Sequence, residues 1–257
     1  MSIDPRAVVD PSARISDNVT IGPFSVIGPD VEIGSGTVIG PHVVIYGPTT
    51  IGIDNTIYQY SSIGEDPQDK KYHGEQSRLE IGDRNTIREF VTINRGTEDG
   101  GGLTKIGNDN WLMAYIHIAH DSIIGNHTTF SNGASLAGHV IVNDHVSLGG
   151  FTLVHQFCKI GKYAFCGMGS AISKDVLPFT MVSGNPAHPF GPNTEGLKRN
   201  KFSKEQIKNI KNAYKIIYRS GLTVENAIEN LNDIAEEDGE VKVLINFLES
   251  STRGVIR

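Results

Sequence analysis

An aliphatic or otherwise apolar residue recurs at every sixth position of this chain. The repeat runs without a break over residues 3–63, resumes over 81–93 and continues over 106–172. A period of six matches neither an α-helix, at about 3.6 residues per turn, nor a simple alternating strand. It indicates short extended segments separated by turns at fixed intervals, which is the signature of a solenoid.

The turns of this solenoid are marked by small residues. Glycine often follows the repeated residue, as in Ile21-Gly22 and Ile124-Gly125, and provides backbone freedom where the chain bends. Three hexads predict one coil of a triangular parallel β-helix, with coils about 4.8 Å apart. The pattern resembles the hexapeptide repeat of left-handed β-helix acyltransferases. The left hand is implied by that resemblance alone, because parallel crossovers are normally right-handed.

Two polar segments interrupt the repeat. Residues 65–80 and 95–105 are expected to leave the prism as loops, and loops on a solenoid often carry its function. Residues 100–102 are three glycines without the following Gly-Lys-Ser/Thr of a phosphate-binding loop, so we expect them to provide flexibility. We predict a mainly β protein, with a left-handed β-helix domain over 1–190 and an α-helical domain over 191–257.

Amphipathic helices are expected in the C-terminal domain. Ser203 and Gln206 form a capping box, and the helical pattern that follows ends near Gly221. Further helices are expected from Thr223 and from about Glu240. Packed together, these helices would cover the last coil, whose edge is otherwise open.

Charge and composition favour a cytoplasmic protein. The net charge is −6, and no signal-like leader or membrane-spanning apolar run is present in the sequence. Cys158 and Cys166 both fall on inward positions of the repeat, so we expect them to be small core residues rather than a disulfide or a metal pair.

Basic residues concentrate in one segment, residues 198–219, where eight lysines and arginines accompany a single acid. Such a run is often a solvated helix face, and the functional alternative is a docking surface for an acidic partner. Nucleic acid is not favoured, because interleaved aromatic residues and overall basicity are missing. The residues proposed for docking are Lys198, Lys201, Lys204, Lys208 and Lys211.

Six of the nine histidines lie in one stretch of the repeat. With coils of 18 residues, His120, Gly138 and Gln156 fall at the same point of successive coils, and Asp121 stacks over His139. A base, its orienting acid and an oxyanion donor could therefore meet on one edge.

Two other interpretations of the histidines stay open. A polar ladder on a β-helix edge is often simply solvated, and we assign His127 and His145 to that class. Alternatively, γ-type carbonic anhydrases are trimeric left-handed prisms whose zinc is held by histidines. We disfavour a zinc enzyme because the C-terminal region would then have no role, and we predict no metal and no cofactor. A non-catalytic scaffold or ice-binding prism is the third possibility.

A closer resemblance rests on five sequence blocks. They are residues 118–121 (IAHD), 136–139 (LAGH), 154–158 (VHQFC), 191–199 (GPNTEGLKR) and 251–254 (STRG). Together they resemble the UDP-N-acetylglucosamine O-acyltransferase family, and the resemblance covers essentially the whole chain. It implies a homotrimer that transfers a 3-hydroxyacyl group from acyl carrier protein to the 3-hydroxyl of UDP-N-acetylglucosamine, the first step of lipid A biosynthesis.

The resemblance also implies roles for individual residues. His120 would be the general base, Asp121 would orient it, and the Gly138 N–H would stabilise the oxyanion. The expected substrate-binding residues are Asp69, Lys71, His117, His139, His155, Gln156, Asn193, Glu195 and Arg199. Because family members carry their sites between neighbouring prisms, these residues would come from two chains.

Met168 lies where the family places the residue that meets the end of the acyl tail. Its bulk would favour a shorter 3-hydroxyacyl group of about ten carbons, because overpacking a rigid groove is costly. Alternatively, this methionine only packs on the prism surface. The sequence leaves open the chain length itself, the choice between a 3-hydroxyl and a 3-amino acceptor, and the order of substrate binding.

Overall fold

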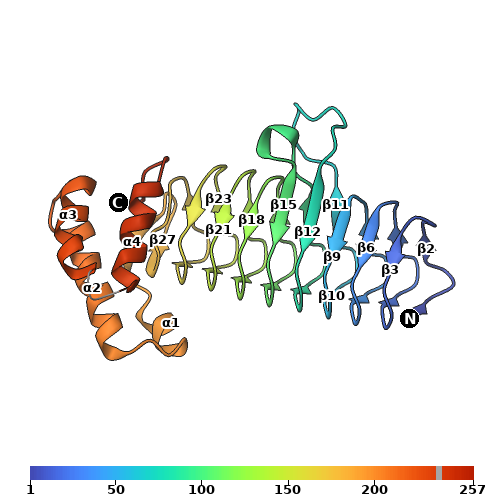
Figure 1. The fold of residues 1–257 in the computed structure, drawn as a ribbon, viewed down its shortest axis with the longest axis horizontal. Helices are drawn as coiled ribbons and strands as arrows, with labels where there is room; N and C mark the ends of the chain where they lie inside the picture. Colours follow the sequence, from blue (N-terminus) through green and yellow to red (C-terminus); the bar gives the residue numbers. More distant parts are fainter. Residues whose placement is uncertain (236–238) are drawn as a thin grey trace.

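The computed structural model describes residues 1–235 and 239–257, which form a long three-sided prism with helices at its C-terminal end (Figure 1). Very short strands wind around the prism axis and pair in parallel with the coils above and below. The predicted parallel β-helix is therefore confirmed.

Each side of the prism is one sheet, named here sheet A, B or C. Sheet A contains β1 (Ser2–Ile3), β4 (Thr20–Ile21), β7 (Val38–Ile39), β10 (Thr56–Ile57), β13 (Thr86–Ile87), β16 (Trp111–Leu112), β19 (Thr129–Phe130), β22 (Ser147–Leu148), β25 (Phe165–Cys166), β27 (Thr180–Ser183) and β28 (His188–Pro192). Sheet B contains β2 (Val8–Val9), β5 (Val26–Ile27), β8 (Val44–Ile45), β11 (Ser62–Glu65), β14 (Thr92–Asn94), β17 (His117–Ile118), β20 (Ser135–Leu136), β23 (Leu153–Val154) and β26 (Ala171–Ile172). Sheet C contains β3 (Arg14–Ile15), β6 (Val31–Ile33), β9 (Thr49–Ile51), β12 (Arg78–Ile81), β15 (Leu103–Ile106), β18 (Ile123–Ile124), β21 (Ile141–Val142) and β24 (Lys159–Ile160).

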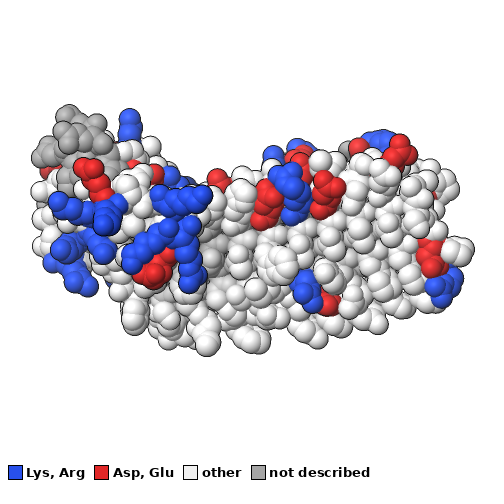
Figure 2. All heavy atoms as spheres, turned by 90° about the horizontal axis from the view of Figure 1, so that it is seen from below, with Lys and Arg blue, Asp and Glu red and all other residues white. Residues whose placement is uncertain are grey.

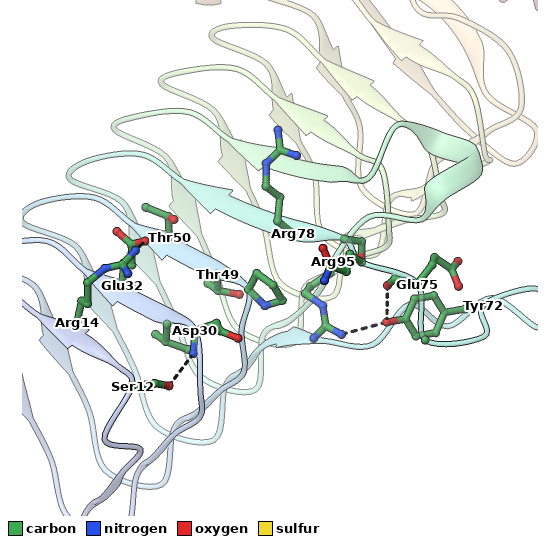
Figure 3. A pocket seen from close by; sticks show the side chains of 15 residues that line it. Ser12, Arg14, Asp30, Glu32, Thr49, Thr50, Tyr72, Glu75, Arg78 and Arg95 are labelled. Carbon is green, nitrogen blue, oxygen red and sulfur yellow. Dashed lines mark hydrogen bonds and ion pairs between the residues drawn. The ribbon is translucent and has the colours of Figure 1, made fainter.

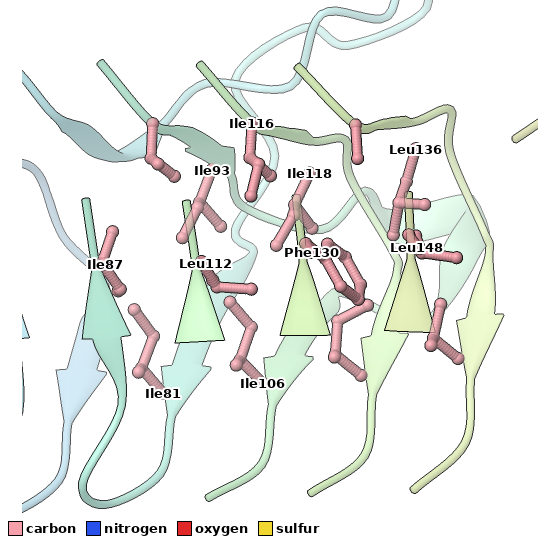
Figure 4. Packing of buried hydrophobic residues seen from close by; sticks show 14 of the residues in the cluster. Ile81, Ile87, Ile93, Ile106, Leu112, Ile116, Ile118, Phe130, Leu136 and Leu148 are labelled. Atoms are coloured by element: carbon pink, nitrogen blue, oxygen red, sulfur yellow. The ribbon is translucent and has the colours of Figure 1, made fainter. Parts of the chain in front are cut away.

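The register of these strands stacks the repeated aliphatic residues directly on one another. Ile21 pairs with Ile39, and Ile39 pairs with Ile57. From Ile21 onward the repeated position is buried throughout, and Figure 4 shows part of the resulting interior column. Ile3 is 37% exposed because it belongs to the first coil, which has no coil beneath it.

The corners of the prism carry side chains in the left-handed backbone region. Phe24, His42, Tyr60, Phe90 and Tyr115 all have positive φ angles. Because they occupy the same point of successive coils, their rings stack in a ladder with centroids 4.8–5.4 Å apart. Non-glycine residues seldom adopt this region, and this ladder was not predicted from the sequence.

The two loops are narrower than predicted. β11 continues through Glu65 and β12 already begins at Arg78, so the ends of the predicted loop 65–80 are strand. The predicted loop 95–105 contains a 3-10 helix, η1 (Glu98–Gly100), and its last residues belong to β15. The sequence did not predict these strand ends because many of their side chains are polar. Outward positions on a side of the prism do not need to be apolar.

The helical region lies beyond the last coils and is joined to them by an antiparallel pair, β27 and β28. Its helices are α1 (Thr194–Arg199), α2 (Lys204–Arg219), α3 (Val224–Ala235) and α4 (Gly239–Ser250). α2 has the predicted capping box, and α3 and α4 begin near the predicted residues, whereas the short α1 was not predicted. The proposed domain boundary at residues 190/191 falls within β28. Within the described ranges, no helix is long and apolar enough to cross a membrane.

These helices pack on the end of the prism. Phe179 and Leu177, which follow the last hexads, are buried in one cluster with Ile210 and Leu244 from α2 and α4. The C-terminal tail then turns back, and Ile256 is buried with the interior column of the prism. The predicted covering of the last coil is therefore confirmed.

Candidate active site

The centre of the candidate site is a histidine paired with an aspartate at the corner between sheets B and C. His120 and Asp121 follow the end of β17, and Asp121 has a φ of 59°. His120 Nδ1 lies 2.8 Å from Asp121 Oδ2. Among the described residues nothing hydrogen-bonds to His120 Nε2, so this nitrogen is free to act.

Asp121 is held as a carboxylate. Its side chain is only 1% exposed, and burial by itself would raise its pKa. Hydrogen bonds from His120 and from the hydroxyl and N–H of Thr97 outweigh burial and lower the pKa of Asp121. The carboxylate of Asp121 is therefore charged at neutral pH.

The coils above bring Gly138 and His139 to this pair. A Cβ atom at Gly138 would lie 2.5 Å from Cε1 and 2.7 Å from Nε2 of His120, so the imidazole occupies the space above this glycine. His139 Nε2 lies 3.7 Å from Asp121 Oδ2, and its ring stacks on Phe157 of the next coil. The predicted stacking of Asp121 with His139, and of His120 with Gly138, is confirmed.

The neighbouring histidines have different surroundings. His139 has a lowered pKa, mainly because burial disfavours its charged form. His117 accepts or donates a hydrogen bond with the Thr92 hydroxyl at 2.8 Å, and burial followed by the charge of His120 lowers its pKa. His155 and Gln156, one coil further on, are exposed.

The ladder of His127 and His145 lies on another corner. The two rings stack on each other with centroids 4.9 Å apart, and the His145 ring also stacks on Tyr163 at 4.5 Å. Neither ring contacts the His120 pair, so nothing in this ladder contradicts the assignment of His127 and His145 to a solvated polar ladder.

The predicted substrate-binding residues of the first loop lie close to the Asp121 carboxylate. Asp69 and Lys71 line a hollow of about 460 Å³ between the two loops, together with Thr97 and Asp99. The negative charges of Asp69 and Asp99 act to raise the pKa of His139 against the effect of burial. Thr97 therefore belongs both to this hollow and to the surroundings of Asp121.

A larger hollow, of about 590 Å³, lies between the root of the first loop and sheet C (Figure 3). None of the site histidines lines it. Arg95 projects into it and is 8% exposed. Its guanidinium donates to the Gly64 carbonyl and to Asp66, and it also reaches the hydroxyl of Tyr72. Arg95 thus anchors the first loop to the coil that carries the second, a role that sequence reasoning missed.

The proposed nucleotide-contacting residues are not brought to His120 within one chain. Asn193 caps α1 by accepting from the Gly196 N–H, and its amide donates to the Tyr163 carbonyl at 2.9 Å. Tyr163 lies on the corner between sheets C and A, whereas His120 lies between B and C. Glu195 and Arg199 on α1 are exposed at this other corner.

Met168 lies on the opposite edge of sheet B from the site. It precedes β26, whereas His120 and Gly138 follow β17 and β20 of the same sheet. Its side chain is 76% exposed. The outer face of sheet B therefore connects the histidine pair with Met168.

The basic segment forms a surface patch over the helical region, as Figure 2 shows. The basic patch is defined by Lys198, Lys201, Lys204, Lys208 and Lys211, all of which are exposed. Glu195 lies at its edge, and a hydrogen bond from Lys198 lowers the pKa of Glu195.

One group of side chains has the geometry for a metal ion. Ligand atoms of His120, Asp121 and His139 all lie within 4.8 Å of one another. However, Asp121 already accepts hydrogen bonds from Thr97 and lies within hydrogen-bond distance of His120, so its lone pairs are largely used. The arrangement suits an orienting carboxylate better than a metal ligand.

Comparisons with known proteins place this geometry in context. A model described as UDP-N-acetylglucosamine O-acyltransferase, domain 2, matches residues 175–256, and a bacterial transferase hexapeptide model matches 12–47 and 103–138. The acyl-[acyl-carrier-protein]–UDP-N-acetylglucosamine O-acyltransferases of Alkalilimnicola ehrlichii and Halorhodospira halophila are each 58% identical over 99% of this chain and 99% of their own length.

Solved structures agree with these relatives. The UDP-N-acetylglucosamine O-acyltransferase of Moraxella catarrhalis has 46% identity and a TM-score of 0.98, with both chains covered completely. The corresponding Acinetobacter baumannii structure has 49% identity and a TM-score of 0.97, with 99% of each chain covered. The predicted left-handed β-helix with a helical C-terminal region is confirmed.

Proposed function

The chain belongs to the UDP-N-acetylglucosamine O-acyltransferase family and is an acyltransferase, and on that premise we propose that it acylates the 3-hydroxyl of UDP-N-acetylglucosamine. The donor is a 3-hydroxyacyl thioester on acyl carrier protein. The reaction is the first step of lipid A biosynthesis and takes place in the cytoplasm. The single observation that carries the proposal is the His120–Asp121 pair, with Nδ1 2.8 Å from Oδ2 and no partner for His120 Nε2 among the described residues.

This pair has the arrangement of a general base. Nε2 of His120 takes the proton from the sugar 3-hydroxyl while the hydroxyl oxygen attacks the thioester carbonyl. Asp121 stabilises the imidazolium that results. When the tetrahedral intermediate collapses, the carbon–sulfur bond breaks, and the imidazolium returns the proton to the thiolate of the carrier. The acyl ester and the free carrier thiol are the products.

Gly138 supports the intermediate in two ways. The absence of a side chain leaves space for the His120 ring. Within the described part of the chain no hydrogen bond uses the Gly138 N–H, so it is available to stabilise the oxyanion.

We infer that substrates bind between chains of a homotrimer. Asp69, Lys71, His117, His139, His155 and Gln156 hold the sugar side on the chain that provides His120. Asn193, Glu195 and Arg199 lie on a different corner of the prism. A threefold assembly sets that corner of one chain against the His120 corner of the next, so the nucleotide is bound from both chains.

Calorimetry with UDP-N-acetylglucosamine tests the choice between an enzyme and a scaffold. Saturable one-to-one binding per chain supports the proposal, and the absence of binding contradicts it. A zinc lyase is the second candidate, and the spacing of the ligand atoms of His120, Asp121 and His139 is the one observation in its favour. Stoichiometric zinc in the purified protein, with loss of activity on chelation, would support that candidate instead.

Replacement of Met168 by glycine is expected to move the preferred acyl group toward longer chains. The exposed methionine side chain limits the length of the acyl groove in the proposal, and its removal relieves overpacking of about 1 to 3 kcal/mol. Competition among 3-hydroxyacyl carrier proteins, read by mass spectrometry, measures the preference. Met168→Leu keeps the bulk and is the control, and an unchanged preference in Met168→Gly would contradict this role.

Reversal of charge at Lys204, Lys208 and Lys211 is expected to raise the KM for the carrier-bound donor roughly tenfold at low salt and to weaken its salt dependence, because a basic docking surface attracts its partner through opposite charge. The KM for UDP-N-acetylglucosamine should change little. A control variant reverses two lysines outside the basic patch, Lys174 and Lys242, which are also exposed, and it is compared with the double reversal of Lys204 and Lys208. If both variants have the kinetics of the unmodified protein, the basic patch is only a solvated helix face.

A further inference from the structure

Residues of the second loop cover the carboxylate of Asp121. The N–H of Thr97 donates to Asp121 Oδ1 at 2.8 Å, and the Thr97 hydroxyl donates to Oδ2 at 2.6 Å. Thr97 is 4% exposed. A single residue of an insertion outside the hexad repeat thus binds both oxygens of the carboxylate that orients His120.

Gly100 packs against the same carboxylate. A Cβ atom there would lie 2.1 Å from Asp121 Cγ and 2.3 Å from each carboxylate oxygen, so no larger residue fits without moving the loop or the aspartate. Gly101 and Gly102 have positive φ angles, but Gly100 does not. Glycine is therefore required at position 100 by lack of space and not by the backbone conformation. Part of the glycine run that suggested flexibility in the sequence is therefore required for close packing.

The hydrogen-bond network also fixes the direction of the Thr97 hydroxyl. The Gly100 N–H lies 3.2 Å from Thr97 Oγ1 and donates to it, so the hydroxyl proton is left for Asp121. Gly102 donates to the Thr97 carbonyl at 2.7 Å and accepts from the Arg78 N–H of β12 at 2.9 Å. The loop is thereby tied to the prism at the point where it touches the carboxylate.

Resting on the proposed function, we propose that Thr97 and Gly100 are positioning residues that lock Asp121 against rotation. With both oxygens fixed, Oδ2 stays directed at His120 Nδ1. The neutral imidazole then carries its proton on Nδ1, which leaves Nε2 unprotonated and able to accept the proton of the sugar hydroxyl. The clasp, residues 97–100, acts on the reaction through the tautomer of His120.

The tautomer can be measured without any assay of the reaction. Nitrogen-15 NMR of histidine-labelled protein, recorded in alkaline buffer, distinguishes Nδ1–H from Nε2–H. We expect Nδ1–H in the unmodified protein and a mixture in Thr97→Val, which keeps the shape but removes the hydroxyl. We also expect kcat to fall about tenfold in Thr97→Val, with KM changed less than about twofold. Thr97→Ser should restore both.

Thr128→Val is the matched control, because Thr128 is also buried and donates to a side-chain oxygen, Asn110 Oδ1, at 2.7 Å. It should leave the tautomer and kcat unchanged. Gly100→Ala, which displaces Asp121 by contact, should reproduce both changes and decides the question if Thr97→Val does not fold. An unchanged tautomer and kcat in folded Thr97→Val or Gly100→Ala would overturn the clasp. If the variants shift the tautomer but the unmodified protein transfers no acyl group, the role of the clasp is supported and the proposed function is refuted.

Discussion

Replacement of His120 by alanine is expected to lower kcat at least about 100-fold, the usual effect of losing a general base. His120 Nδ1 lies 2.8 Å from Asp121 Oδ2, and His120 Nε2 has no hydrogen-bond partner among the described residues. The interior column of the prism does not include this side chain, so cooperative unfolding should change little. Steady-state rates and circular dichroism melts measure the two effects.

His127→Ala is the matched control for this variant. His127 is also a corner histidine, but its ring stacks on His145 and lies in the other ladder. Its replacement should leave kcat near that of the unmodified protein. Near-normal turnover in His120→Ala would refute the mechanism, whatever the behaviour of the control.

Replacement of Gly138 by alanine is expected to lower kcat by about 10- to 100-fold, because displacement of a catalytic group by about 1 Å has effects of that size. The added Cβ would lie 2.5 Å from His120 Cε1, so the imidazole must move. The backbone N–H is kept in this variant. A loss of rate therefore reports displacement of the base, not removal of an oxyanion donor.

Gly150→Ala is the corresponding control, since the nearest atom to a Cβ at Gly150 is at 3.4 Å, an ordinary contact. It should be tolerated. Equal rates in Gly138→Ala and in the unmodified protein would show that the imidazole does not occupy the space above Gly138 during the reaction.

The hexad repeat made most of the fold predictable, because in a solenoid the period converts sequence distance directly into spatial distance. The pairing of Asp121 with His139 follows from their separation by one coil of 18 residues, and the structure places their side chains 3.7 Å apart. The same arithmetic located Gly138 above His120. The contacts of His120 and Asp121 with the following coil were therefore predictable without side-chain coordinates.

The contacts of Asp121 with the preceding coil and its inserted loop were not predictable in this way. Below the site, Thr92 pairs with His117 at a separation of 25 residues, because the second loop is inserted in that coil. Subtraction of 18 from Asp121 therefore misses Thr97 and Gly100. Inserted residues follow no period, and their contacts depend on loop packing that composition does not specify. The glycine run within this insertion, residues 100–102, was the only signal in the sequence.

The short helix α1 and the pair β27–β28 escaped prediction for a related reason. Both lie where the repeat has ended, and α1 has only six residues, too few for a hydrophobic period. Its start depends on one side chain, Asn193, which bonds both Gly196 and Tyr163. The contact with Tyr163 is tertiary and has no trace in local sequence.

An acyl-transfer assay is the most direct test of the proposed reaction. Purified protein is incubated with UDP-N-acetylglucosamine and a series of 3-hydroxyacyl carrier proteins, and the product is analysed by mass spectrometry and by NMR of the sugar ring. We expect a single 3-O-acylated nucleotide sugar, formed by the unmodified protein and at least about 100-fold more slowly by His120→Ala. No product from folded protein, or equal product from both proteins, would contradict the account.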